Sequence, residues 1–446
     1  MTTTAELVSG VVTNRVKPLV RWGLTHAVPS RVLKDGADKG DLQARLTVEA
    51  QNLSPEEIAE LFSQIRAQGP LVRSKFSYVS VDHAVVKEVL SSTQFRTGFP
   101  GDDRPAISRL VQWARREGLH PVEPPSMLVT DGDDHTRYRK LVSRVFTARA
   151  VEGLRERTEA IAADLLDELA ARGGPVDLVA AYCEKLPVAV ISEILGVPES
   201  ERANVLRMGG HAAASLDLGI DWSTFRTVDG ALDEFDEWLG KHFDHLRANP
   251  GDDLFSTLLH ATDDEGRLSE RELKATAGLV LAAGFETTVN LLSNAIRLLV
   301  EHPEQLAGLR ADPSGWGNAV DEALRYDPPV LLTGRSAAED TEVAGQRVGE
   351  GSMTTLVLAG ANRDPQVFDN PDAFDVAREN ARDHLSFSTG RHFCLGAALA
   401  RMEGEVGLRA FFDRFDVELL PGAGRRPTRI LRGYETLPAR LVQRSN

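Results

Sequence analysis

The chain has 446 residues, 42% hydrophobic and 26% charged, a composition typical of globular proteins rather than disordered or membrane chains. Its net charge of -15 argues against nucleic acid or an anionic membrane as the main partner, because binding phosphates needs a basic surface. Neither a linker-like stretch nor an internal repeat divides the sequence. We therefore expect one domain over residues 1–446, with 1–45 as an N-terminal arm.

The N-terminal arm mixes apolar residues with Arg15, Lys17 and Arg21, so it lacks the about 18 uncharged apolar residues of a membrane span. We expect no transmembrane anchor, and a helix or strand edge that covers the body; a peripheral amphipathic arm is the alternative. The two cysteines, Cys183 and Cys394, lie far apart in sequence and cannot form a disulfide framework. This cysteine usage predicts a cytoplasmic protein, which we expect to be a monomer.

In chain order, the first strand-like run covers residues 71–81, and the pattern from about residue 134 to about 328 is almost entirely helical. The best defined helix begins near Ser269, where Ser269 and Glu272 form a capping box, and no proline interrupts it before Pro303. Further strand-like runs lie at 341–348, at 352–358 and near the C-terminus. We therefore predict a mainly α fold with a minor β portion.

The segment 387–396 has the sequence Phe-Ser-Thr-Gly-Arg-His-Phe-Cys-Leu-Gly. Apolar residues with helical spacing follow Cys394, which places its sulfur at a helix N-terminus, where free N–H groups stabilise a thiolate. Two other interpretations stand beside this one. A lone cysteine is usually a small buried hydrophobic residue, and a cysteine near His392 can serve as a nucleophile.

This segment resembles the haem-binding loop of the cytochrome P-450 superfamily, F-x-x-G-x-[HR]-x-C-x-G. The resemblance implies a haem b cofactor with Cys394 as the thiolate ligand of the iron, flanked by Phe387 and Gly396. It also implies the fold of that superfamily, in which a long central helix lies over the haem opposite the cysteine loop. Ser388 departs from the pattern, because many members have a glycine there.

Residues 283–288, Ala-Gly-Phe-Glu-Thr-Thr, lie inside the long predicted helix and resemble the oxygen-activation motif of the superfamily. The resemblance implies that Thr287 hydrogen-bonds the oxygen substrate and that Glu286 relays protons, a general-acid role split over two residues. Ala283 would lie against the haem. A small-residue notch for helix packing is the structural alternative, and it explains Gly284 but not the acid and the alcohol.

Glu322 and Arg325 share one helix face and resemble the E-x-x-R pair of the superfamily, with Arg378 as the third member of a buried triad. We assign these three residues to support of the fold; an exposed surface pair is the alternative. The residues that resemble the haem propionate ligands of bacterial members are His135, Arg139, Arg335 and His392. A charged helix surface is the alternative for His135 and Arg139.

The substrate pocket is predicted from the same resemblance, and its residues are mostly apolar. They are Leu279, Ala283, Phe99, Leu128, Leu331 and Tyr434, with Met127 and Met208 nearby. An apolar pocket favours a fatty acid or other lipid, a terpenoid or a steroid, with a macrolide also possible. The expected reaction is hydroxylation with dioxygen as co-substrate.

The chain has no G-x-G-x-x-G nucleotide motif, so its electrons must come from another protein. The resemblance implies a ferredoxin with its reductase, and Arg137, Lys140, Arg144 and Arg391 form a candidate basic docking patch. A peroxygenase or haem isomerase of the same fold is one alternative function. A non-catalytic haem sensor or lipid carrier is another.

Overall fold

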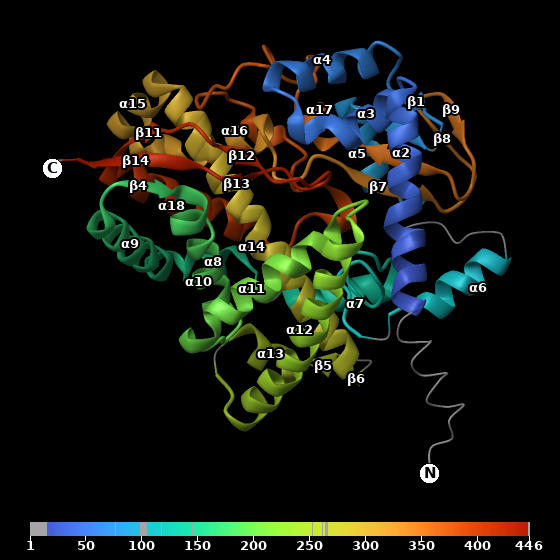
Figure 1. Cartoon of the computed structure of the whole chain (residues 1–446), viewed down its shortest axis with the longest axis horizontal. Helices are drawn as coiled ribbons and strands as arrows, with labels where there is room; N and C mark the ends of the chain where they lie inside the picture. Colours follow the sequence, from blue (N-terminus) through green and yellow to red (C-terminus); the bar gives the residue numbers. More distant parts are fainter. Residues whose placement is uncertain are drawn as a thin grey trace.

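The structure is a computed structural model in which helices dominate and short strands gather in small sheets (Figure 1). It describes residues 16–75, 77–98, 105–116, 118–143, 146–251, 253–260, 262–263 and 266–444. The predicted mainly α fold with a minor β portion is confirmed.

The α-helices after the N-terminal arm extend over most of the described chain. They are α3 Leu42–Glu49, α4 Pro55–Arg66, α5 His83–Ser91, α6 Pro105–Ala114, α7 Gly132–Ser143, α8 Ala148–Glu152, α9 Arg155–Arg172, α10 Lys185–Ile194, α11 Arg202–Ala213, α12 Trp222–Ala248, α13 Leu254–His260, α14 Glu270–Glu301, α15 Pro303–Ala311, α16 Trp316–Tyr326, α17 Leu358–Ala361 and α18 Ala397–Arg414. The helical pattern predicted from residue 134 onward missed α3, α4, α5 and α6, although Ser54 and Glu57 cap α4 with the same kind of capping box as Ser269 and Glu272.

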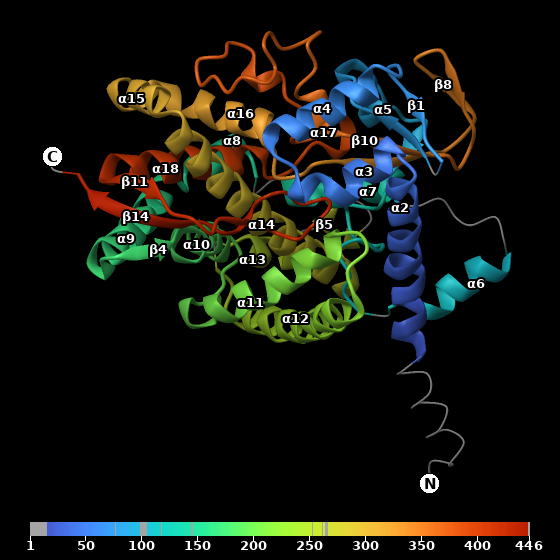
Figure 2. The same ribbon diagram turned by 45° about the horizontal axis from the view of Figure 1, so that its top comes forward.

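Helix α14 is the predicted long helix, and its 32 residues follow the expected capping box of Ser269 and Glu272. It crosses the middle of the molecule in both views (Figures 1 and 2). Among the described helices it alone is long and apolar enough to cross a membrane, but 83% of its most apolar window is buried within the protein. It is therefore the core helix around which α10, α11, α16 and α18 pack.

The largest sheet has five strands in the order β1-β2-β10-β7-β3. Strand β10 runs parallel to β2, and the other pairings are antiparallel. The strands are β1 Val72–Arg73, β2 Tyr78–Ser80, β3 Phe95–Arg96, β4 Pro175–Asp177, β5 Thr262–Asp263, β6 Gly266–Arg267, β7 Thr333–Ala337, β8 Thr341–Val343, β9 Gln346–Val348, β10 Met353–Leu356, β11 Phe415–Leu419, β12 Gly424–Arg425, β13 Tyr434–Thr436 and β14 Pro438–Gln443. Strand β7 was not predicted, because Thr-Gly-Arg-Ser-Ala lacks the apolar alternation that marks a strand.

The N-terminal arm is helical from residue 16 to Asp38, where the segment η1 (Gly23–Ala27) leads into α2 (Val28–Asp38). The arm lies against the body as a covering helix, because Trp22 Nε1 donates to the Ile220 carbonyl oxygen over 2.9 Å and Arg21 pairs with Asp229 of α12. Its helical residues thus pack beside the start of α12 and the end of α6 (Figure 2).

Candidate functional site

Cys394 lies in a tight loop that leads into α18. Its backbone N–H donates to the Phe387 carbonyl oxygen over 2.8 Å, and the Phe393 N–H donates to the Gly390 carbonyl oxygen over 3.1 Å. Helix α18 starts at Ala397, directly after its cap residue Gly396. The sulfur therefore sits just before the first turn of a helix, as the sequence predicted.

Two residues of this loop have left-handed backbone conformations. Gly390 has a φ of +69°, and a Cβ atom there would lie only 2.9 Å from the Leu90 carbonyl oxygen at the end of α5, so glycine is required. Ser388 has a φ of +61°, which L side chains rarely adopt, and its buried hydroxyl oxygen has no hydrogen-bond partner among the described residues. The departure from glycine at Ser388 therefore carries backbone strain.

The Cys394 side chain is accessible, whereas Cys183 is buried in the core. Although Cys394 is accessible, the protein atoms packed around the loop disfavour its charged form and raise the pKa of the thiol; the Gly396 N–H and the positive charges of Arg139 and Arg401 oppose that rise. A thiol that two arginines and a helix start favour as thiolate is a suitable soft ligand for iron.

On α14, residues Ala283, Gly284 and Thr287 interrupt a buried stretch. Every other residue from Ala275 to Asn290 is buried, so these three mark an accessible stripe at positions i, i+1 and i+4 of one helix face. The Thr287 hydroxyl donates to the Ala283 carbonyl oxygen over 2.9 Å, and the helix stays regular through this segment. The glycine and the two threonines therefore do not break the helix.

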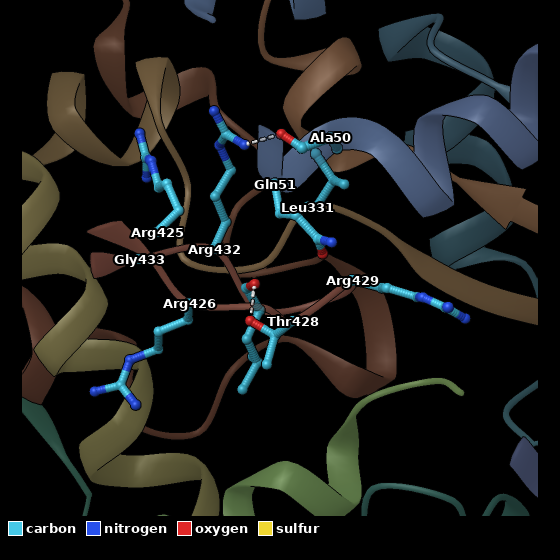
Figure 3. Close-up of a pocket in the computed structure, with 10 residues that line it drawn as sticks. Ala50, Gln51, Leu331, Arg425, Arg426, Thr428, Arg429, Arg432 and Gly433 are labelled. Atoms are coloured by element: carbon cyan, nitrogen blue, oxygen red, sulfur yellow. Dashed lines mark hydrogen bonds between the residues drawn. The ribbon is translucent and has the colours of Figure 1, made fainter. Parts of the chain in front are cut away.

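Glu286 lies outside this accessible stripe of α14 and is buried. Its Oε1 lies 3.1 Å from Arg426 Nη1, and the same guanidinium donates to Glu184 Oε1 over 3.2 Å. In Figure 3, Arg426 extends away from Arg425 and Arg432. Burial raises the pKa of Glu286, the Arg426 charge lowers it, and Glu184 raises it further, so the carboxyl holds its proton more readily than usual.

His135 of α7 meets His392 of the cysteine loop, with ring centroids 4.2 Å apart. His392 Nε2 lies 2.9 Å from Asp131 Oδ1, whereas the buried His135 Nε2 has no hydrogen-bond partner among the described residues. Burial, His392 and Arg139 lower the pKa of His135 to about 4, against the opposing charge of Asp131. An additional anion beside His135 would satisfy this nitrogen.

Arg335 is buried in β7 and pairs with no carboxylate among the described residues; it donates only to its neighbours Thr333 Oγ1 and Gly334 O. Burial lowers the pKa of Arg335 to about 10, with Asp131 raising it and Arg391 lowering it. A buried guanidinium without an anion is unusual. The unpartnered nitrogen of His135, this guanidinium and the accessible thiol fit an iron porphyrin, whose metal needs the sulfur and whose carboxylates need cations.

Arg139, predicted to bind the same anionic group, also contacts the cysteine loop. Its Nη2 donates to the Phe393 carbonyl oxygen over 2.7 Å, so it contacts the cysteine loop itself. It lies one helical turn from His135 on α7. The structure thus brings His135, His392 and Arg139 together, and Arg139 also donates to the backbone beside Cys394.

The predicted triad is buried, which excludes the exposed-pair alternative. Arg325 Nε and Nη2 donate to the two carboxylate oxygens of Glu322 over 2.7 and 2.8 Å. Arg378 Nε lies 3.2 Å from Glu322, and the Asp375 N–H donates to the same carboxylate over 2.8 Å. The Arg325 guanidinium also holds the carbonyl groups of Asn362, Pro371 and Ala373. These contacts tie α16 to the segment that precedes the cysteine loop.

The predicted pocket residues fall into different environments. Leu279 and Leu331 are buried, Leu128 is 41% exposed, and Phe99 lies outside the described residues. Tyr434 is buried between two arginines: its ring lies 4.2 Å from the Arg425 guanidinium, and its hydroxyl accepts from Arg297. Ile430, four residues before Tyr434, contacts the predicted pocket residue Leu331, because the Leu331 N–H donates to the Ile430 carbonyl oxygen over 2.8 Å.

Two arginines of the candidate docking patch contact other groups of the same chain. Arg137 Nη1 lies 3.3 Å from Glu272, and Arg391 Nη2 donates to the Ser92 carbonyl oxygen over 2.9 Å. Lys140 is exposed, and Arg144 lies outside the described residues.

Four residues that organise the site were not predicted from the sequence: Asp131, Thr97, Arg426 and Glu184. Asp131 accepts from His392 and from Thr97, and Arg426 with Glu184 fixes the carboxyl of Glu286. Each pair joins segments more than 30 residues apart in sequence, so no local spacing links the partners. Burial raises the pKa of Asp131, but the hydrogen bonds from His392 and Thr97 outweigh that effect and lower the pKa to about 2, so the carboxyl stays ionised.

Comparison with known proteins gives a consistent result. The Cytochrome P-450 family model matches residues 212–312 and 317–439. A putative cytochrome P-450 140 of Mycobacterium tuberculosis is 50% identical over 431 residues, 96% of this chain and 98% of that protein. The 6-deoxyerythronolide B hydroxylase of Saccharopolyspora erythraea is 43% identical over 321 residues, 71% of this chain and 78% of that protein.

Solved structures agree with this match. The crystal structure of P-450BioI with a hexadec-9Z-enoic acid ligated acyl carrier protein has a TM-score of 0.78 at 29% identity, covering 87% of this chain and 99% of that one. The Bacillus subtilis polyketide synthase cytochrome P-450 PksS has a TM-score of 0.76 at 31% identity, with the same two coverages. The cysteine loop, the buried triad and these matches agree, and the chain belongs to the cytochrome P-450 family of oxidoreductases.

Proposed function

We propose that this enzyme binds haem b through Cys394, receives two electrons from a ferredoxin and hydroxylates an apolar small molecule with dioxygen. The observation that carries the proposal is the accessible Cys394 thiol at a helix start, beside a buried Arg335 without a carboxylate partner and a His135 nitrogen without a hydrogen-bond partner among the described residues. Family membership implies haem iron and the use of dioxygen, and several relatives are named hydroxylases or monooxygenases. When bound, the haem supplies the iron centre that activates dioxygen.

The residues of the chain divide the remaining tasks. Cys394 would hold the iron between Phe387 and Gly396, and His135, Arg335, His392 and Arg139 would hold the haem carboxylates. Their cluster around Asp131 is already assembled on α7, β7 and the cysteine loop.

Proton delivery is assigned to the adjacent residues Glu286 and Thr287. Glu286 has a raised pKa and therefore keeps its proton to higher pH than an exposed glutamate does. Thr287 opens onto the accessible stripe, where its hydroxyl exchanges its bond to Ala283 for one to the oxygen substrate. The proton then passes from a buried acid to an alcohol on the reacting side of the helix.

The substrate is proposed to be apolar, with Leu279, Ala283, Leu331 and Leu128 in the pocket wall. Two relatives favour the polyketide class, since one is named 6-deoxyerythronolide B hydroxylase and another a polyketide biosynthesis protein. Fatty acyl chains are the next candidates. A spin-state titration of the haem against macrolides, fatty acids, terpenes and steroids tests this: only a compound that enters the pocket displaces water from the iron.

The proposal also covers the location of the enzyme, its domain organisation and its redox partner. We place the enzyme in the cytoplasm as a single domain, with a ferredoxin and its reductase as electron source. The exposed Lys140 near the cysteine loop is one cation for docking such a partner.

The ligand assignment is tested with two alanine variants. The ferrous carbonyl complex of the parent should show the red-shifted Soret band of a thiolate ligand, and Cys394→Ala should abolish it. Cys183→Ala is the matched control, because that thiol is fully buried in the core and should leave the band in place. An unchanged band in Cys394→Ala would overturn the assignment.

A further inference from the structure

Two buried asparagines, Asn290 and Asn294, follow Glu286 on the same face of α14, each one helical turn further along. Asn294 is well bonded, because its Nδ2 donates to the carbonyl oxygens of Asp327 and Arg432 over 3.0 and 3.1 Å. Asn290 is 0% exposed, and neither its Nδ2 nor its Oδ1 has a hydrogen-bond partner among the described residues. Buried amides normally bond to protein or to ordered water, because an amide without partners is costly to bury.

The amide of Asn290 lies where α14 meets the hairpin that β12 and β13 form. A Cβ atom on Gly433 would collide with the Asn290 side chain, so the hairpin backbone packs directly against this amide. The Arg426 N–H donates to the Gly433 carbonyl oxygen over 3.1 Å, which places Arg426 at the same junction. Glu286 Oε1 lies 3.1 Å from Arg426 Nη1. The carboxyl of Glu286 and the amide of Asn290 therefore meet two paired residues of one hairpin.

Arg426 adds an unused donor to this junction. Its Nη1 and Nη2 meet Glu286 and Glu184, whereas its buried Nε has no hydrogen-bond partner in the part of the chain that the structure describes. Arg426 and Gly433 both line a small hollow that has room for water and is partly open to solvent (Figure 3). Three buried polar atoms without partners thus gather where the hairpin separates Glu286 from solvent.

We propose that Asn290 and Arg426 bind a water molecule against the carboxyl of Glu286, and that this water resupplies the proton that Glu286 gives up. A buried water typically makes about three hydrogen bonds to polar groups that the protein leaves unsatisfied. Here it accepts from Arg426 Nε, bonds to the Asn290 amide and donates to Glu286. Asn290 is then a positioning residue, because it acts through the water and not on the oxygen substrate.

The inference rests on the proposed role of Glu286 in proton delivery. After Glu286 has released its proton toward Thr287, the bound water passes one proton to the carboxylate and takes another from water in the hollow. Arg426 keeps its charge throughout, and no group is oxidised or reduced. The acid is thereby ready for a second proton without any movement of α14.

The matched variants Asn290→Ala and Asn294→Ala of the haem-loaded full chain test this water site. Asn290→Ala should keep the urea midpoint near that of the parent, because no described residue bonds to the amide that it removes. It should lower product formed per electron, with a rate loss below the about 100-fold expected for Glu286→Gln. Asn294→Ala should do the reverse, because it leaves two carbonyl oxygens and Arg425 without a partner.

Infrared spectroscopy supplies a readout that needs no turnover. The C=O stretch of the protonated Glu286 carboxyl is recorded at mildly acidic pH and assigned by its disappearance in Glu286→Gln. The stretch should move to higher frequency in Asn290→Ala, because the carboxyl loses a hydrogen bond from water. In Asn294→Ala the band should keep its position.

Three results overturn the water site. They are an unmoved stretch in Asn290→Ala, a urea midpoint that falls as far as in Asn294→Ala, and full product per electron in Asn290→Ala when Glu286→Gln lowers it. If Glu286→Gln leaves product per electron unchanged, the proposed role of Glu286 is wrong and the resupply of its proton fails with it. The infrared band still shows in that case whether the water is bound.

Discussion

The two sides of the candidate site each contain a buried glutamate that meets arginine, and the two glutamates differ in how many donors hold them. On the cysteine side, Glu322 receives both Nε and Nη2 of Arg325, Nε of Arg378 and the Asp375 N–H. On the α14 side, Glu286 meets one nitrogen of Arg426, 3.1 Å away, and shares that guanidinium with Glu184.

This difference separates a structural role from a chemical one. A buried carboxylate with four donors is fixed in position, because losing any donor leaves a charge without a partner. A buried carboxyl with one shared donor and a raised pKa can gain or release a proton at little structural cost. The cysteine side is therefore rigid, and we call it the locked side. The α14 side can gain and release a proton, and we call it the exchanging side.

The largest effect should come from the locked side. Glu322→Ala leaves Arg325 buried without its carboxylate, which should cost about 3–5 kcal/mol of unfolding free energy and most of the haem incorporation. Urea unfolding and the haem-to-protein ratio measure both effects. Glu304→Ala, exposed on α15, is the control and should change stability by less than about 0.5 kcal/mol.

The next effect should appear in chemistry and not in stability. Glu286→Gln and Thr287→Ala should lower product formed per electron consumed, with a rate loss of about 100-fold for the removed general acid. Urea midpoints should stay near that of the parent, because each variant keeps the size of its side chain or removes only a few atoms. If Glu286→Gln unfolds as readily as Glu322→Ala, the contrast between a locked and an exchanging glutamate is wrong.

The same contrast explains what the sequence could predict. The capping box at Ser269, the helix start after Cys394 and the pair Glu322 and Arg325 join residues within a few positions of each other, and all three appear in the structure. The partners Asp131 with His392 and Glu286 with Arg426 join distant segments, where only the folded chain defines the contact. Local rules therefore predicted the contacts between residues close in sequence and missed those between distant segments, on both sides of the site.

A third prediction concerns the pH dependence of the exchanging side. Burial raises the pKa of Glu286, and the Arg426 charge opposes that rise, so Arg426→Gln should raise the pKa of Glu286 further. The carboxyl would then stay protonated to higher pH, and the alkaline limb of product formation should move upward by the same amount. A pH series of product per electron, with Arg429→Gln as the control from the same segment, measures the shift. An unmoved limb would show that Arg426 does not set the proton affinity of Glu286.

The smallest effect should come from strain within the rigid side. Ser388 adopts a φ of +61° beside the cysteine loop, and its hydroxyl has no partner among the described residues, so Ser388→Gly should stabilise the protein by about 1 kcal/mol. Gly390→Ala should do the opposite, because its φ is +69° and its Cβ would press on the Leu90 carbonyl oxygen. Thermal unfolding of both variants in the haem-bound form gives the two signs. A destabilised Ser388→Gly would mean that the serine hydroxyl contributes a contact that outweighs its backbone strain, and that the rigid side tolerates strain for a reason beyond packing.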